Sequence, residues 1–340
     1  MSPIPTAKSR RRFLATGAAC ALLPAALHAQ GADPFAAVAD RARSLDQLHT
    51  ILIRQNGADV FGLTPRGPAP DRPVNVKSVS KSIIAILAGC ALDRAEIPAL
   101  DATLGELAPG LIPAGADPRV AGITTADLLT LRAGLARTSG PNYGSWIASP
   151  DWVADALSRE MIAEPGSRML YSTGTTHVLG ALLAERAGES LLSLARTRLG
   201  DPLGVAIPPW TRDPQGRFMG GNEMALSPRA LIRIGEMMRQ NGTYEGTRLL
   251  SASYVAASFQ PRTRSPFSGL AYGYGWFLGG QGATRYALAR GYGGQIIAIL
   301  PGLRATVVIT SDPTRPARSQ GYFGDLMQLL EGPVTAALTA

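Results

Sequence analysis

Two stretches of the chain show the short apolar runs and turn residues that are typical of β-strands. Between residues 48 and 63, two apolar β-branched runs flank Asn56-Gly57, a pair that favours a tight hairpin turn. Between residues 271 and 310, four short apolar runs are separated by glycine or proline. This spacing predicts an antiparallel meander.

Apolar residues recur at helical spacing through much of the remaining chain. In residues 80–95, Ile83, Ile84, Leu87 and Ala91 follow the interval of a buried helix face. The same kind of pattern predicts helices over residues 34–45, 125–131, 152–161, 176–187, 190–199, 227–240, 322–330 and 333–339.

Strands at both ends of a mainly helical middle predict an α+β fold. An antiparallel sheet flanked by helices is expected from about residues 34–95 and 266–340, with the N-terminal hairpin joining the C-terminal strands. An all-helical lobe, from about residue 96 to 265, is expected as an insertion. Because 46% of the chain is hydrophobic, residues 30–340 can bury one large core shared by both lobes.

Residues 1–29 have the pattern of an export signal and are set aside from fold reasoning. Ser9–Leu14 matches the twin-arginine pattern, an apolar run from Ala15 to Leu27 follows, and cleavage is expected after Ala29. The twin-arginine export machinery is then an expected partner, and the mature protein is expected to be periplasmic or secreted. The alternative is a cytosolic protein with a basic N-terminal helix. No stable membrane span is expected, because no segment offers about 18 uninterrupted apolar residues.

The net charge becomes ordinary once this signal is removed. It is +8 for the whole chain, and the loss of Lys8 and Arg10–Arg12 lowers it to +4. The remaining arginines are scattered, without a basic stripe interleaved with aromatics, so no nucleic-acid binding is expected. Cys90 is then the single cysteine and is expected to be a small core residue.

The sequence lacks the motifs of several common enzyme classes. Beyond the signal the histidines are His49 and His177, with no HExxH motif and no cysteine pair, so no metal site is expected and both are assigned structural roles. No GxxxxGK or GxGxxG motif occurs, so no cofactor is expected. The absence of a GxSxG elbow argues against a serine enzyme that uses histidine as its base.

A serine and a lysine three residues apart are the strongest candidates for chemistry. Lysine is scarce in this chain, and beyond the signal it occurs only as Lys77 and Lys81. Ser78 lies at the predicted start of a helix, and Lys81 follows one turn later on the same side. A buried lysine can lose its proton and accept that of a serine hydroxyl, which a guanidinium cannot do. The alternative is that Ser78 or Ser80 caps the helix and Lys81 is solvated.

Three ordered segments give the chain a resemblance to a known superfamily. They are "VKSVSKSIIAILAGCALDRAEI" (76–97), "GITTADLLTLRAGL" (122–135) and "MLYSTGTTHVLGALL" (169–183). They resemble the penicillin-recognising serine hydrolases, in particular class C β-lactamase-like esterases and amidases, including the 6-aminohexanoate-oligomer hydrolase type. The segments "GYGW" (273–276) and "GYGGQIIAILPGLRATVVIT" (291–310) fit the same pattern. The resemblance implies a β-lactamase/transpeptidase-like fold.

The resemblance also implies a catalytic set. Ser78 matches the acylated nucleophile, Lys81 its lysine partner, and Tyr171 the tyrosine of the Tyr-x-Asn motif. Such a tyrosine can act as general base if the lysine ammonium depresses the pKa of its phenol. The sequence leaves open whether Lys81 or Tyr171 takes the first proton.

Two departures from the family pattern affect the expected pocket. Thr173 replaces the usual asparagine and removes an amide that contacts the acyl side chain in β-lactamases. The third motif is placed at residues 289–291, where Ala289 replaces the usual lysine or histidine, although a slip by one residue is an alternative. Tyr292 would then donate the second oxyanion-hole N–H beside that of Ser78. Arg290 would replace the lost cation if its side chain points inward.

The loop-rich segment "GPNYGSWIASPDW" supplies further pocket candidates. Tyr143, Trp146 and Trp152 are aromatics that could line a substrate pocket, and lobe packing is the alternative for them. With Thr173, Arg290 and Gly291, the residues Tyr143 and Trp146 complete the predicted pocket set.

The expected function is hydrolysis of a small ester or amide through an acyl-enzyme at Ser78, by an exported enzyme without metal or cofactor. One alternative is a D-alanyl-D-alanine carboxypeptidase or a class C-type β-lactamase. An alternative of another class is a non-catalytic sensor that binds penicillin or peptidoglycan.

Overall fold

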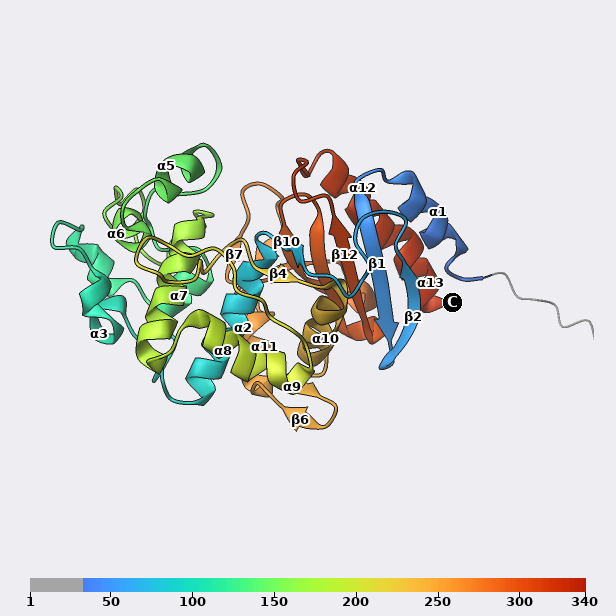
Figure 1. Cartoon of the computed structure of the whole chain (residues 1–340), viewed down its shortest axis with the longest axis horizontal. Helices are drawn as coiled ribbons and strands as arrows, with labels where there is room; N and C mark the ends of the chain where they lie inside the picture. The colour runs from blue at the N-terminus through green and yellow to red at the C-terminus, as the bar shows by residue number, and fades with distance from the viewer. Residues whose placement is uncertain (1–32) are drawn as a thin grey trace, which may run out of the picture. The chain divides into compact units, whose positions relative to one another are not determined.

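An eight-stranded antiparallel sheet, seen mainly on the right of Figure 1, is the main sheet of the structure. The computed structural model describes residues 33–340, of which Pro34–Ala340 form one compact unit. The strand order is β2-β1-β12-β11-β10-β9-β8-β7. The bounds are β1 Leu48–Gln55, β2 Ala58–Leu63, β7 Thr263–Arg264, β8 Ala271–Tyr272, β9 Phe277–Gly279, β10 Tyr286–Gly291, β11 Gln295–Leu300 and β12 Ala305–Ser311. Two short pairs lie outside it: β3 (Val74–Asn75) with β4 (Ala225–Leu226), and β5 (Thr243–Tyr244) with β6 (Thr247–Arg248).

The N-terminal hairpin joins the C-terminal strands, as the sequence predicted. Asn56 and Gly57 have φ values of 52° and 82°, the left-handed pair that a type I′ turn requires. Strand β1 then pairs along its other side with β12, from Leu48 opposite Ser311 to Gln55 opposite Ala305. The predicted α+β fold is confirmed.

Helices are the most abundant regular structure in the described chain. Their bounds are α1 Ala36–Ser44, α2 Val79–Asp93, α3 Leu104–Leu107, α4 Thr125–Leu129, α5 Tyr143–Ile147, α6 Trp152–Leu157, α7 Thr173–Ala187, α8 Leu191–Ala195, α9 Asp201–Leu203, α10 Pro228–Arg239, α11 Ala252–Ser258, α12 Tyr322–Leu329 and α13 Thr335–Thr339. None of the helices between residues 33 and 340 has both the length and the apolar character needed to cross a membrane.

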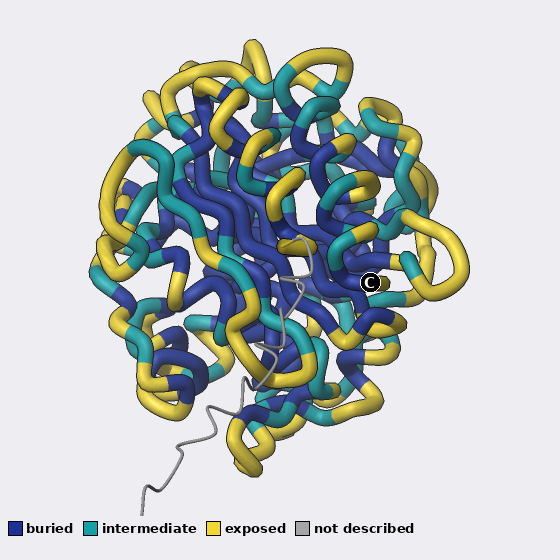
Figure 2. Tube along the Cα trace, turned by 90° about the vertical axis from the view of Figure 1, so that its right-hand side faces the viewer, coloured by how far each residue is buried: buried dark blue, intermediate teal, exposed yellow. Residues whose placement is uncertain are grey.

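Helices cover both faces of the sheet, so its central strands are buried on both sides (Figure 2). On β11, Ile296 and Ala298 belong to the cluster that contains α1 and α12 residues. The alternating Ile297 and Ile299 belong to the cluster of α2 and α10. All six residues of β11 are buried, which explains why this strand reads as an unbroken apolar run.

The helical lobe is organised around α7. Helices α2, α4, α6 and α8 all contact it, and its residues 173–183 are buried. The helix starts at Thr173, earlier than predicted, because its first amides are bonded by a distant segment. The Thr173 N–H donates to Ser139 Oγ (2.9 Å) and the Gly174 N–H to Thr138 Oγ1 (2.7 Å). Local patterning cannot reveal a cap supplied from another part of the chain.

One helix packs on the sheet although it comes from the segment predicted to form the helical lobe. Helix α10 falls within residues 96–265 and contacts β1, β11 and β12. The Thr306 hydroxyl of β12 donates to Glu236 (3.2 Å), and a Cβ at Gly235 would lie 2.6 Å from the Thr306 side chain. An amphipathic pattern shows that a helix is packed on one face but does not say against which layer.

The predicted export signal, residues 1–29, lies outside the described residues. Twin-arginine export, the cleavage site and the resulting location therefore remain predictions.

Candidate active site

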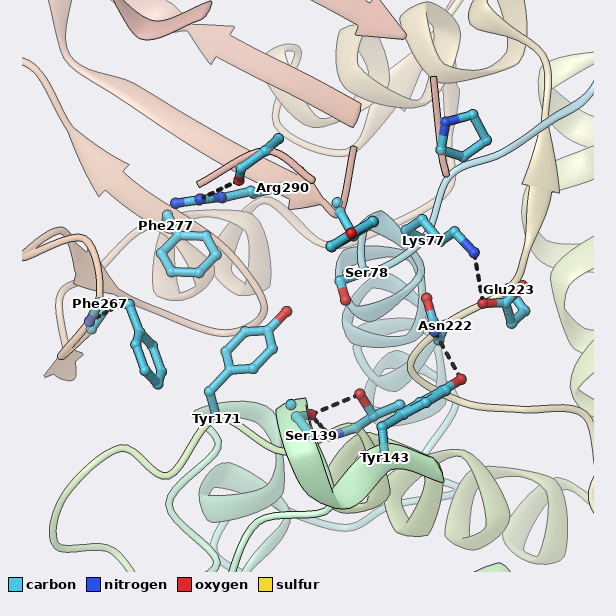
Figure 3. A pocket seen from close by; sticks show the side chains of 17 residues that line it. Lys77, Ser78, Ser139, Tyr143, Tyr171, Asn222, Glu223, Phe267, Phe277 and Arg290 are labelled. Atoms are coloured by element: carbon cyan, nitrogen blue, oxygen red, sulfur yellow. Dashed lines mark hydrogen bonds and ion pairs between the residues drawn. The ribbon is translucent and has the colours of Figure 1, made fainter. Parts of the chain in front are cut away.

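Ser78 lies at the N-terminal end of α2, between the sheet and the helical lobe (Figure 3). The residue before it, Lys77, has a φ of 52°, a left-handed conformation that is uncommon for lysine. Two contacts hold this kink: the Lys77 N–H donates to Asn75 Oδ1 (2.9 Å), and Lys77 Nζ pairs with Glu223 (3.1 Å). Strained backbone of this kind persists only where the surroundings enforce it.

The helix-cap alternative for Ser78 is not what the structure shows. Its side chain makes no cap bond to α2, although Ser78 occupies the N-cap position. The Ser80 hydroxyl is bonded to other groups: it donates to the Lys77 carbonyl (2.6 Å) and accepts from the Met224 amide (3.2 Å). The Ser78 side chain instead contacts Lys81, whose Nζ lies 3.3 Å from Ser78 Oγ.

Lys81 is a buried amine with three polar neighbours. Only 3% of its surface is exposed. Besides Ser78, its Nζ lies 2.6 Å from the Gly221 carbonyl oxygen and 3.2 Å from Thr173 Oγ1. A neutral amine has two N–H donors and one lone pair. With its donors directed to Gly221 and Thr173, the lone pair is left for the proton of Ser78.

Burial favours the neutral form of this amine. It lowers the pKa of Lys81 to about 7. The amine is therefore able to accept a proton near neutral pH, which an exposed lysine cannot do.

Tyr171 points its hydroxyl toward Ser78 from the opposite side of the cavity (Figure 3). Burial raises the pKa of the phenol, and the Ser78 hydroxyl and the positive charge of Arg290 offset this only in part. Lys81 faces the ring of Tyr171, with Nζ 5.0 Å from the ring centroid. A depressed phenol pKa, the condition for Tyr171 to act as first base, is thus not found, and the geometry favours Lys81.

The end of β10 reaches the start of α2 because residue 291 is glycine. A Cβ at Gly291 would overlap the Val76 carbonyl oxygen, so a side chain there would push the two segments apart. Gly291, Tyr292 and Ser78 all line one cavity. Within residues 33–340 the backbone N–H groups of Ser78 and Tyr292 donate to no protein acceptor, so both are free to bind a substrate oxygen.

Of the third-motif residues, Ala289 lies in the core and Arg290 lies at the cavity. Ala289 is 1% exposed and packs in the core, so it contributes no side chain to the site. Arg290 lines the cavity with its guanidinium 3.5 Å from the Phe323 ring centroid, donating to Ser319 Oγ (3.1 Å) and the Ala317 carbonyl (3.4 Å). It forms no ion pair in the described part of the chain. Desolvation lowers its pKa to about 10.

The cavity beside Ser78 has a volume of about 540 Å³. It is lined by the predicted residues Ser78, Tyr143, Tyr171, Thr173, Arg290, Gly291 and Tyr292, and by Lys77, Ser139, Gly140, Asn222, Glu223, Ser265, Phe267, Phe277, Pro313 and Ala317. With Lys81, the structure therefore brings together seven of the predicted site residues around Ser78, from segments far apart in the sequence.

Trp146, predicted to line the pocket, does not reach it. Its side chain is fully buried, and its indole N–H donates to the Trp152 carbonyl (2.9 Å). Tyr143, one helical turn earlier, lies between it and the cavity, with ring centroids 5.8 Å apart. Trp146 and Trp152 are thus core residues, the packing alternative.

One wall of the cavity, formed by Asn222 and Glu223, was not predicted. The Asn222 amide donates to the Tyr143 hydroxyl (2.9 Å), and Glu223 pairs with Lys77. Glu223 has a φ of 65°, and such a backbone turn at a non-glycine residue leaves no pattern in the sequence.

Neither His49 nor His177 lines the cavity beside Ser78. His177 is fully buried and bonded on both ring nitrogens, as expected of a structural residue. His49 packs against the turn at Gly67, where a Cβ would lie 2.5 Å from its ring. Among residues 33–340, no three His, Cys, Asp or Glu side chains are grouped as a metal site would need.

Comparison with known proteins places this geometry in a family. The family model described as Beta-lactamase matches residues 50–326. No curated protein matches the chain. The putative 6-aminohexanoate-dimer hydrolase from Bacillus anthracis is 15% identical, with 86% of this chain and 79% of that chain covered and a TM-score of 0.72.

Two further solved structures superpose over nearly their whole length. EstCE1, described as a hydrolase with promiscuous acyltransferase activity, is 19% identical, with 90% and 98% covered and a TM-score of 0.73. A penicillin-binding protein homolog from Caulobacter crescentus is 17% identical, with 90% and 98% covered and a TM-score of 0.73. At these identities the likeness shows the shared fold, and the family model covers most of the chain. The chain belongs to the beta-lactamase family of serine hydrolases.

Proposed function

We propose that this protein is an exported hydrolase that cleaves a small ester or amide through an acyl-enzyme at Ser78. The observation that carries the proposal is the contact between Ser78 Oγ and Lys81 Nζ at 3.3 Å, made by an amine whose pKa burial lowers to about 7, so that about half of it is neutral at pH 7. A serine hydroxyl needs such a neighbour to become a nucleophile. Export rests on the pattern of residues 1–29 alone.

In the proposed acylation step, the Ser78 proton passes to Lys81 Nζ as Ser78 Oγ bonds to the substrate carbonyl carbon. The carbonyl π electrons move to oxygen, and the N–H groups of Ser78 and Tyr292 bind the resulting oxyanion. When the C=O bond re-forms, the C–O or C–N bond breaks and the leaving group takes a proton. Tyr171 is suited to deliver it, because its raised pKa keeps the phenol protonated. The Tyr171 phenolate regains a proton from the Lys81 ammonium, which makes the amine neutral again. Water then gives a proton to Lys81 as its oxygen bonds to the acyl carbon, and this proton passes to Ser78 Oγ when the bond between Ser78 Oγ and the acyl carbon breaks and the acid product leaves.

The cavity supports a substrate of modest size with an apolar part. Its volume, about 540 Å³, lies within the usual range of small-molecule sites. Tyr143, Phe267, Phe277 and Tyr292 supply aromatic walls. Thr173, which stands where the family has asparagine, binds Lys81 and Ser139. Its hydroxyl therefore supports the amine instead of a substrate acyl group.

Covalent labelling tests the proposal. After incubation with a fluorophosphonate, intact-protein mass spectrometry should show a single adduct, and peptide mapping should place it on Ser78. A penicillin adduct that persists without turnover, with no ester hydrolysis, would favour the sensor alternative. Absence of any adduct with both reagents would reject the proposal.

The activity should depend on pH through Lys81. Below its pKa of about 7 the amine is protonated and cannot accept the Ser78 proton. For a neutral ester, kcat/KM should therefore fall about tenfold per pH unit below 7 and level off above about pH 8. If kcat/KM fell only below about pH 5, as is typical of a carboxylate base, the role of Lys81 would be contradicted. A kcat/KM that stays constant from about pH 5.5 to 8.5 would contradict it as well.

A further inference from the structure

His177 is a fully buried histidine that the proposed chemistry does not use. It lies on α7, with the rings of Trp146 and Trp152 packed against it. Its two ring nitrogens contact different segments: Nδ1 lies 3.2 Å from the Gly220 backbone nitrogen, and Nε2 lies 3.1 Å from Asp213 Oδ2.

These contacts define which nitrogen of His177 carries the proton. The Gly220 N–H can only donate, so Nδ1 must present its lone pair. The proton therefore lies on Nε2 and is donated to Asp213. The other oxygen of Asp213 accepts from the Arg217 backbone N–H (2.7 Å). Burial raises the pKa of Asp213, but the bonds from His177 and Arg217 lower it by more, so the carboxylate stays charged.

The segment held by His177 is the one that holds Lys81. Gly220 donates to His177, and the carbonyl of the next residue, Gly221, accepts from Lys81 at 2.6 Å, the shortest polar contact of that amine. The backbone of Gly220 packs directly against α7, because a Cβ at this position would overlap the Thr176 carbonyl oxygen. Two consecutive glycines have wide conformational freedom, so the direction of the Gly221 carbonyl depends on anchors at both ends.

We propose that His177 and Asp213 are a positioning pair: they fix Gly220-Gly221 so that the Gly221 carbonyl holds Lys81 with its lone pair toward Ser78. The downstream anchors are the bonds of Asn222 to Tyr143 and of Glu223 to Lys77. This inference rests on the proposed function, because it assigns the pair a role in the chemistry of Lys81. Neither member of the pair lines the cavity.

Asp213→Asn tests positioning with little change in packing, because it changes almost no volume. It also removes the ion pair between Asp213 and the Arg217 guanidinium (3.5 Å). Oδ1 of the new side chain still accepts from the Arg217 N–H, so its NH₂ must face His177 Nε2. The new NH₂ group and the Nε2–H of His177 are both donors and repel each other, unless the His177 proton moves to Nδ1. A proton on Nδ1 then opposes the Gly220 N–H, and the glycine segment loses its anchor.

For Asp213→Asn we expect kcat on a neutral p-nitrophenyl ester to fall at least about tenfold, with KM changed less than about threefold. The pH below which kcat falls should increase by about half a unit or more. A looser segment lets water reach Lys81, which raises the pKa of its amine. Asp155→Asn is the matched control: Asp155 lies on α6 in the same lobe and pairs with Arg159, away from the site. Asp155→Asn should change neither kcat nor the pH below which kcat falls.

A second pair of variants tests the same inference if Asp213→Asn folds poorly. In His177→Asn the amide oxygen can occupy the place of Nδ1 and accept from Gly220, whereas in His177→Gln it reaches only the place of Nε2. With folding checked by circular dichroism, His177→Asn should keep several-fold more activity than His177→Gln. Equal activity of His177→Asn and His177→Gln would overturn the inference. So would a folded Asp213→Asn variant with the kcat and the pH dependence of the wild type. Full activity of Ser78→Ala would instead overturn the proposed function, so the two failures are distinct.

Discussion

Replacing Ser78 with alanine is expected to abolish hydrolysis of a p-nitrophenyl ester, lowering kcat/KM by at least about 10³-fold. The substitution removes the atom that forms the acyl bond. The fold should be unaffected, because the Ser78 hydroxyl makes no cap bond to α2 and the usual cost of losing a cap, about 1 kcal/mol, does not apply. The unfolding temperature of Ser78→Ala should therefore match that of the wild type.

The control for this variant is Ser145→Ala, at an exposed serine of α5. It should retain full activity and full fluorophosphonate labelling, whereas Ser78→Ala should lose both. Persistent turnover by folded Ser78→Ala would show that another group is acylated or that water is attacked directly.

Replacing Lys81 with arginine is expected to reduce kcat/KM by about 10²-fold or more while preserving positive charge. A guanidinium stays protonated at any ordinary pH and cannot accept the Ser78 proton. The site also has no room for the larger group, because Lys81 is 3% exposed and its Nζ is enclosed by Gly221 and Thr173.

A second variant separates loss of the base from lack of space for a guanidinium. Lys81→Met fits the space but lacks a proton acceptor, and should be as inactive as Lys81→Arg. Near-normal turnover by either Lys81 variant would exclude it as the base.

The parts of the fold that follow from local pattern were predictable. Asn56-Gly57 alone indicates a tight turn, and the apolar run of β11 indicates a strand covered on both faces. The spacing of Ser78 and Lys81 places both on one side of a helix, and the structure joins them at 3.3 Å. These are short-range relations that the sequence states directly.

The depth at which a side chain lies was not predictable. Tyr143 and Trp146 are one helical turn apart and contact each other, but Tyr143 lines the cavity and Trp146 lies behind it. Periodicity identifies a shared face and says nothing of how many layers separate that face from a cavity.

Backbone contributions to the site were also beyond sequence reasoning. The shortest polar contact of Lys81 is with the carbonyl of Gly221, an atom that every residue has. The kinks at Lys77 and Glu223 bring two distant segments together through positive φ values at residues that seldom adopt them. Such contacts arise only once the tertiary fold has formed.

The pairing of β1 with β12 has a consequence for biosynthesis. The two strands are separated by roughly 250 residues, and even a side-chain bond such as that from Gln55 to the Leu303 carbonyl joins positions 248 apart. A ribosome adding about 5–20 residues per second would leave the hairpin without its neighbour for roughly 10–50 s. During that time the unpaired N–H and C=O groups along the edge of β1 are open to wrong pairing on the nascent chain.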